Sequence, residues 1–97
     1  MKENILEMKM FLDEALSYSL CVKDYFKDGS KEKHYINNFR CYNTKEIKSG
    51  VVLKLWSHEL CLSYILYLTE SEIKNIKIND NLLQLEKEYV TITIEII

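Results

Sequence analysis

The segment from Ser57 to Thr69, SHELCLSYILYLT, places an imidazole, a carboxylate and a thiol beside the most apolar part of the chain. A Cys–His pair can form a reactive thiolate, and a carboxylate can orient the imidazole. If the segment enters a strand, however, His58 and Glu59 point to opposite faces, so that they cannot converge with Cys61. We therefore expect a turn histidine and a buried structural cysteine, and predict no catalytic residues and no enzyme activity.

A metal site is the second possible chemistry. Cys41, Cys61, His34 and His58 could supply zinc ligands, but their spacing lacks the close pairs that bring two ligands from one turn. The two glycines of the chain do not form a phosphate-binding motif. We predict no metal and no cofactor.

The third possibility is a surface that binds a macromolecule. Strand alternation predicts that Phe39, Cys41, Val51, Leu53 and Leu55 face the core. Aromatic rings with a few cations and aliphatic groups then gather on the opposite face, which suits a protein partner or, alternatively, the stacked bases of single-stranded nucleic acid. The predicted partner-binding residues are Arg40, Tyr42, Lys54, Trp56, Ile65, Tyr67 and Tyr89.

A long N-terminal helix is the first element expected to position these residues. Apolar residues at spacings of three and four predict a helix over about 3–28, ending before Gly29. Such a helix would be about 39 Å long, whereas a compact chain of this length is about 32 Å across. We therefore expect either a break near 17–19 or a second copy covering the helix. The residues predicted to form that dimer contact are Met8, Leu12, Ala15 and Ser19.

After Gly29 the apolar period changes from 3.6 to 2, which indicates strands. We predict strands over 35–44, 51–56, 60–68, 76–78 and 89–97, with a buried helix as the alternative for 60–68. Thr69 and Glu72 match a capping box and predict one helical turn between strands. The predicted fold class is α+β, a helix packed on an antiparallel sheet of four to five strands, with a small curled barrel as the alternative.

Length and composition limit the class of protein. A chain of 97 residues, 47% hydrophobic and 29% charged, indicates one globular domain over 1–97. There is no run of about 18 apolar residues and the N-terminus is charged, so we expect neither a membrane partner nor a signal peptide. Three cysteines without a CxxC pair indicate reduced thiols in the cytoplasm.

Charge and codon usage support a ranking of functions. The net charge of −2 makes nucleic acid a less favoured partner than protein. Twelve lysines against one arginine, with no proline, are typical of an AT-rich bacterium or one of its phages. The leading hypothesis is a small non-catalytic inhibitor that occludes a larger protein, such as an anti-CRISPR acting on a defence effector or an immunity protein acting on a toxin. The alternative is an accessory protein that binds single-stranded nucleic acid.

Overall fold

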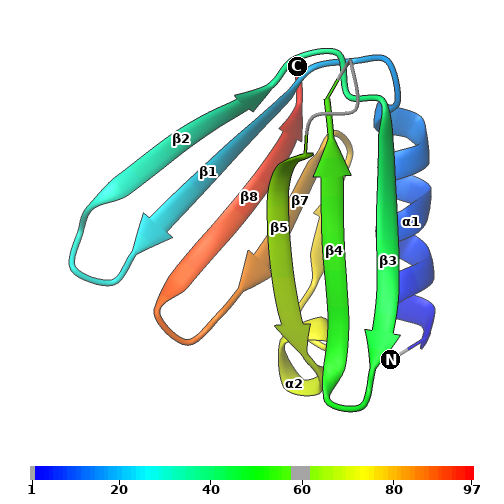
Figure 1. Cartoon of the computed structure of the whole chain (residues 1–97). Helices are drawn as coiled ribbons and strands as arrows, with labels where there is room; N and C mark the ends of the chain where they lie inside the picture. The colour runs from blue at the N-terminus through cyan, green and yellow to red at the C-terminus, as the bar shows by residue number, and fades with distance from the viewer. Residues whose placement is uncertain (1, 58–61) are drawn as a thin grey trace.

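The computed structural model describes residues 2–57 and 62–97, which form one main helix, one helical turn and eight strands (Figure 1). The elements in chain order are α1 (Lys2–Ala15), β1 (Leu20–Phe26), β2 (Lys31–Ile36), β3 (Cys41–Ile47), β4 (Gly50–Trp56), β5 (Leu62–Thr69), α2 (Glu70–Ile73), β6 (Lys77–Asn79), β7 (Leu82–Glu86) and β8 (Val90–Ile96). The predicted α+β class with antiparallel pairing is confirmed, although the strands divide between two sheets.

Five strands in the order β2-β1-β8-β7-β6 form one sheet, and β3-β4-β5 form the other. The three-stranded sheet lies across one part of the larger sheet, while β1 and β2 splay away from β5, and α1 runs alongside β3 (Figure 1). The inner faces of both sheets and one face of α1 enclose a single apolar cluster that includes Met8, Leu12, Phe39, Leu53 and Ile94. No helix among the described residues has the length and apolar character needed to cross a membrane.

The N-terminal helix is shorter than the spacing of apolar residues predicts. It ends at Ala15, and Ser17 adopts a left-handed backbone conformation with φ of 75°. The break expected near 17–19 is present, but the chain then continues as strand β1, so that the prediction of helix up to residue 28 is wrong. Val22 and Phe26 fit the helical period, yet they also alternate with their neighbours as a strand requires. The fold thus avoids a helix longer than its own largest extent of 32 Å.

Gly29 serves a hairpin instead of a helix end. It has a φ of 94° and lies in the turn between β1 and β2, where the Phe26 amide donates to the Ser30 carbonyl at 2.9 Å. Glycine reaches this left-handed region without the steric cost that a side chain imposes. The turn pairs β1 with a strand that begins at Lys31, in a segment that the sequence analysis leaves as loop.

The predicted strand over 35–44 is divided by a corner. Residues 31–36 belong to β2 in the five-stranded sheet, whereas β3 begins at Cys41 in the other sheet. Between them Asn38 has a φ of 55°, and Phe39 exchanges backbone hydrogen bonds with Ser17 and Tyr18 instead of a neighbouring strand. Side-chain alternation therefore does not continue from Phe39 into β3, which changes which residues of β3 face the core.

The predictions for the C-terminal half are confirmed in part. The apolar segment is a strand, β5, and not a helix, while His58 and Glu59, where a turn is predicted, lie outside the described residues. Strand β7 is not among the predicted strands. The capping box is formed, with the Thr69 amide donating to the Glu72 carboxylate at 2.8 Å and α2 following. Strand β8 buries Ile92 and Ile94, as the alternation predicts.

Candidate functional site

The side of the three-stranded sheet that is turned away from the core carries most of the predicted binding residues. Residues directly opposite each other in an antiparallel pair share a face. Lys54 lies opposite Ile65 on β5, and Val52 lies opposite Tyr67. Together with the alternate residues of β3, these define a surface called the outer face: Cys41, Asn43, Lys45, Ile47, Val52, Lys54, Trp56, Ile65 and Tyr67.

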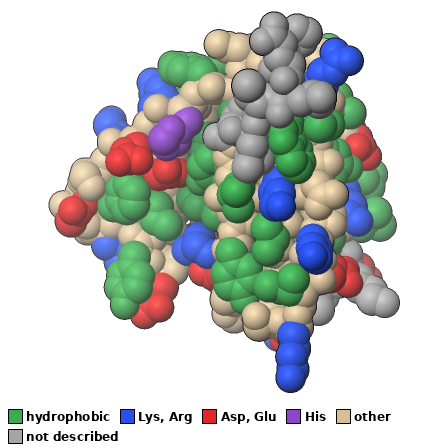
Figure 2. All heavy atoms as spheres, in the orientation of Figure 1, with side chains coloured by type: hydrophobic (Ala, Val, Ile, Leu, Met, Phe, Trp, Pro, Cys, Tyr) green, Lys and Arg blue, Asp and Glu red, His purple; other side chains and the backbone are tan. Residues whose placement is uncertain are grey.

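The outer face exposes large apolar groups. Ile65 is 54% exposed, Ile47 is 40% exposed and Tyr67 is 37% exposed, while Trp56 and Val52 are half-buried. Figure 2 shows hydrophobic and basic side chains interspersed over this sheet. A half-buried tryptophan on the same face as exposed aliphatic and aromatic groups resembles the composition of protein interfaces.

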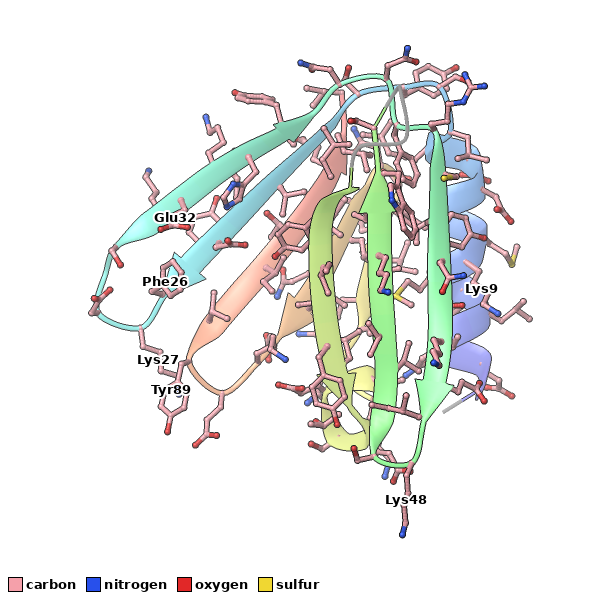
Figure 3. The ribbon with its side chains drawn as sticks, in the orientation of Figure 1. Lys9, Phe26, Lys27, Glu32, Lys48 and Tyr89 are labelled. Carbon is pink, nitrogen blue, oxygen red and sulfur yellow. The ribbon has the colours of Figure 1, made fainter. Side chains whose placement is uncertain are left out.

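The charges on the outer face are all of one sign. Lys45 and Lys54 are its ionisable side chains apart from Cys41 and Tyr67, and it carries no carboxylate. Neither lysine forms an ion pair with another residue that the structure describes. Lys48 projects from the turn between β3 and β4 at the edge of this surface (Figure 3). A chain of net charge −2 therefore presents a positive, partly apolar patch on this side.

Tyr67 is held in place on the outer face. Its hydroxyl lies 2.7 Å from the Ser49 hydroxyl and 3.2 Å from the Ser49 carbonyl. The Lys87 ammonium lies 5.9 Å from the centre of the Tyr67 ring, within the range of a cation–π contact. A ring fixed in this way loses little conformational entropy when a partner covers it.

Four of the seven predicted binding residues, Lys54, Trp56, Ile65 and Tyr67, lie together on the outer face. Arg40 is exposed immediately before β3, where its backbone amide donates to the Trp56 carbonyl at 3.0 Å. It therefore borders the face at the Trp56 end.

Tyr42 and Cys41 lie on the opposite sides of the sheet from those predicted. Cys41 is opposite Trp56 on the outer face, while Tyr42 is opposite Leu55 and faces inward. The Tyr42 hydroxyl donates to the Asp13 carboxylate on α1 at 2.7 Å. Burial, together with this hydrogen bond, raises the pKa of Tyr42 to about 12. Its role is to join β3 to the helix, and the corner before β3 is the reason that the predicted alternation is inverted there.

Tyr89 also lies apart from the outer face. It is 70% exposed in the turn between β7 and β8, in the five-stranded sheet. Figure 3 places it at the tip of that hairpin, near Phe26 and Lys27 at the end of β1. The Lys27 amide donates to the Tyr89 carbonyl at 3.3 Å. The prediction that Tyr89 joins Trp56 on one face is wrong because the two residues belong to different sheets.

The predicted dimer contact on the helix is occupied by the core of the same chain. Met8, Leu12 and Ala15 are fully buried, and Ser19 lies after the helix has ended. The large apolar side chains that α1 leaves exposed are Leu6 and Met10. Met8, Leu12 and Ala15 are therefore not available to a second copy, while the half-buried Ser19 is no longer part of the helix.

The residues that the sequence analysis considered as metal ligands or nucleophiles lie in different parts of the chain. His58, Glu59 and Cys61 lie outside the described residues. Cys41 is half-buried on the outer face. His34 instead lies with Asp24 and Glu32 on the β1–β2 hairpin, and their ligand atoms lie within 4.8 Å of one another, the one such group among residues 2–57 and 62–97.

Two functional features were missed by the sequence analysis. Lys45 belongs to the outer face, and the short turn at Lys48 and Ser49 already implied that Lys45 pairs with Val52 across the hairpin. The pair Glu32 and His34 has the two-residue spacing that puts both on one face of a strand. The sequence does not predict this pair because no strand is predicted over 29–34.

The comparisons with known proteins were made with family models, curated sequences and solved structures. The chain matches no family model, no curated protein and no solved structure. A function is therefore inferred from the chemistry of the outer face itself.

Proposed function

We propose that this protein is a small, non-catalytic interaction module that binds a larger protein through the outer face. The observation that carries the proposal is the combination of Trp56, Ile65 and Tyr67 on one sheet surface with two lysines that form no ion pair with any residue of the ranges 2–57 and 62–97. Aromatic anchors supply most of the binding energy of protein interfaces, and surrounding polar groups set orientation and specificity.

The partner surface is proposed to be acidic. Lys45 and Lys54 have no carboxylate partner among the described residues, and no acid shares their face. Carboxylates on the partner would pair with these ammonium groups and steer its approach. Acidic groups elsewhere on the chain would orient the module, because the whole molecule is negative while this face is positive.

Occlusion is the proposed mode of action. A small rigid surface that binds tightly can block an active site or a nucleic-acid channel of a larger protein without performing chemistry. Bacterial defence effectors and toxins are the proposed class of target, because the lysine-rich, arginine-poor composition is typical of an AT-rich bacterium or one of its phages. In this proposal the protein is an anti-CRISPR-like or immunity-like inhibitor.

Single-stranded nucleic acid is the second candidate, because Trp56 could stack on a base while Lys45 and Lys54 contact phosphates. One feature favours protein. Val52, Ile47 and Ile65 add aliphatic groups to the face, and these groups offer neither stacking nor hydrogen bonds to a base.

The test is a capture experiment with matched variants of the bait. Wild-type protein and the variants Ile65→Asp, Lys54→Glu and Tyr89→Ala are immobilised and exposed to lysate of the bacterium that carries the gene. A captured protein is then purified and its complex measured directly. We expect a stoichiometric complex with wild type and with Tyr89→Ala, since Tyr89 is exposed but lies on the other sheet. Ile65→Asp and Lys54→Glu should each weaken it about tenfold or more.

A complex that is equally strong with all four baits would place binding elsewhere and contradict the proposal. A parallel titration uses an unstructured oligonucleotide at low salt. Tight binding that is lost on Trp56→Ala, without any protein complex, would transfer the function to nucleic acid.

A further inference from the structure

Two carboxylates face each other across the β1–β2 hairpin. Asp24 lies directly opposite Glu32 in the strand pairing, although like charges in this position oppose pairing. Asp24 is only 8% exposed. Among the described residues, the ion-pair partner of both carboxylates is His34, which lies on the same face as Glu32. Figure 2 shows the histidine flanked by acidic side chains on this hairpin.

The distances within this group fit the edges of a metal coordination shell. His34 Nε2 lies 3.2 Å from Asp24 Oδ2 and 3.6 Å from Glu32 Oε2. Ligands at about 2.0–2.1 Å from a tetrahedral zinc ion are separated from one another by about 3.3 Å. Both measured separations are therefore close to those that an ion would require, and rotation of the exposed Glu32 side chain brings its oxygen into place.

Asp24 is also held from the other side. The Tyr64 hydroxyl, on β5 of the other sheet, donates to Asp24 Oδ1 at 3.3 Å and leaves Oδ2 directed at His34. Hydrogen bonds of this kind orient the carboxylate ligands of metal sites.

We propose that Asp24, Glu32 and His34 form a binding site for a divalent transition-metal ion. One imidazole nitrogen with two carboxylate oxygens is a donor set for zinc, cobalt or nickel rather than for magnesium or calcium, which take oxygen ligands. The ion replaces the proton on His34 Nε2 and neutralises the two facing carboxylates. The side chains of His34 and Glu32 are 44% and 62% exposed, so the ion can enter from solvent and keeps a coordination position for water.

The test uses tag-free, chelator-treated protein titrated with zinc chloride in a calorimeter near neutral pH. We expect one ion per chain and a rise in melting temperature with zinc concentration. His34→Ala and Glu32→Gln should each weaken binding about tenfold or more, and circular dichroism of each variant without metal checks that it is folded. The wild-type complex with cobalt should show the absorption bands of a low-symmetry site.

His58→Ala is the matched control, because it removes the other histidine of the chain while leaving this group intact. It should bind zinc as wild type does. Absence of zinc binding to wild type would overturn the proposal and leave the group as an ion pair of His34 with two carboxylates. Loss of binding in His58→Ala, or unchanged binding in His34→Ala, would also overturn it.

Discussion

The carboxylate of Glu72 should contribute measurably to stability, since it connects three parts of the fold. It accepts hydrogen bonds from the Thr69 amide at 2.8 Å and the Thr69 hydroxyl at 3.0 Å, at the start of α2. It also pairs with the Lys87 ammonium at 3.0 Å, and Lys87 in turn donates to the Tyr67 carbonyl on β5. The side chains of Lys87 and Glu72 are only 22% and 15% exposed.

Replacing Glu72 with Gln isolates the effect of its charge. Glutamine keeps the shape of the side chain and can still complete a capping box, but it leaves the Lys87 ammonium without its counter-ion. A charge-assisted hydrogen bond in a partly shielded place contributes more than an exposed ion pair, so we expect a loss of about 1–2 kcal/mol in the free energy of unfolding. Glu70→Gln is the control, because Glu70 is an exposed acid in the same helical turn, where we expect about 0.5 kcal/mol or less.

The effect should depend on pH in a defined direction. Burial opposes ionisation of Glu72, but the hydrogen bonds from Thr69 and Lys87 outweigh it and hold its pKa below the ordinary value of 4.5. Because the pKa in the folded state is lowered, the contribution of the carboxylate is fully present above the unfolded pKa. It is lost as the pH falls through the folded value. The difference in stability between wild type and Glu72→Gln should therefore be constant near neutrality and should shrink as the pH falls below the ordinary pKa of 4.5 and through the lowered folded value.

Urea denaturation followed by the fluorescence of Trp56, the one tryptophan of the chain, measures these differences. Curves are recorded for wild type, Glu72→Gln and Glu70→Gln at neutral pH and at several acid pH values. If Glu72→Gln is no less stable than Glu70→Gln, or if its deficit is the same at every pH, the reasoning about this carboxylate is refuted.

Three further predictions concern single side chains. Gly50→Ala should lower the free energy of unfolding by about 2–3 kcal/mol, because the new methyl group would overlap the Leu68 carbonyl oxygen; an unchanged urea midpoint would contradict this. Tyr42→Phe should cost about 1 kcal/mol and remove a late step from an absorbance titration of the tyrosines, since burial raises the pKa of Tyr42 to about 12. Because the folded pKa of Tyr42 is raised, its contribution to stability is fully present below its ordinary pKa of 10 and is lost as the pH rises through about 12. Loss of an early step from the absorbance titration would contradict the burial of Tyr42. Tyr64→Phe should weaken zinc binding about tenfold because it frees the Asp24 carboxylate, and equal affinity in calorimetry would show that this hydroxyl does not position the ligand.

Most elements that follow Gly50 could be predicted from a clear local signal, but β7 (Leu82–Glu86) is not among the predicted strands. Strand β8 alternates without exception, and Thr69 with Glu72 has the spacing of a capping box. The segment 20–26 could not be assigned correctly, since Val22 and Phe26 satisfy both the helical and the strand period. Local pattern also gives no information on strand pairing, and β1 pairs with β8, more than 60 residues away along the chain.

The difference between local pattern and strand pairing also explains which binding residues were predicted. Lys54, Trp56, Ile65 and Tyr67 lie on two adjacent strands, so that alternation alone places them together. The side of the sheet on which Tyr42 lies could not be predicted, because the break in alternation at Asn38 and Phe39 turns Tyr42 to the inner face. Asp24 and Glu32 lie opposite each other in the β1–β2 hairpin. This pairing could not be predicted, because the predicted helix extends to residue 28.

The proposal that the outer face binds an acidic protein surface is tested most directly by reversing charge in two places. Lys45→Glu with Lys54→Glu changes the outer face, while Lys31→Glu with Lys33→Glu makes an equal change on the exposed edge strand β2. The measurement is the association rate with the purified partner at low and high salt. At low salt we expect the association rate of the first double variant to be lower than that of wild type by about tenfold or more. The β2 double variant should associate at the same rate as wild type. Equal slowing by both double variants would mean that only net charge matters, and would contradict the assignment of the binding site to the outer face.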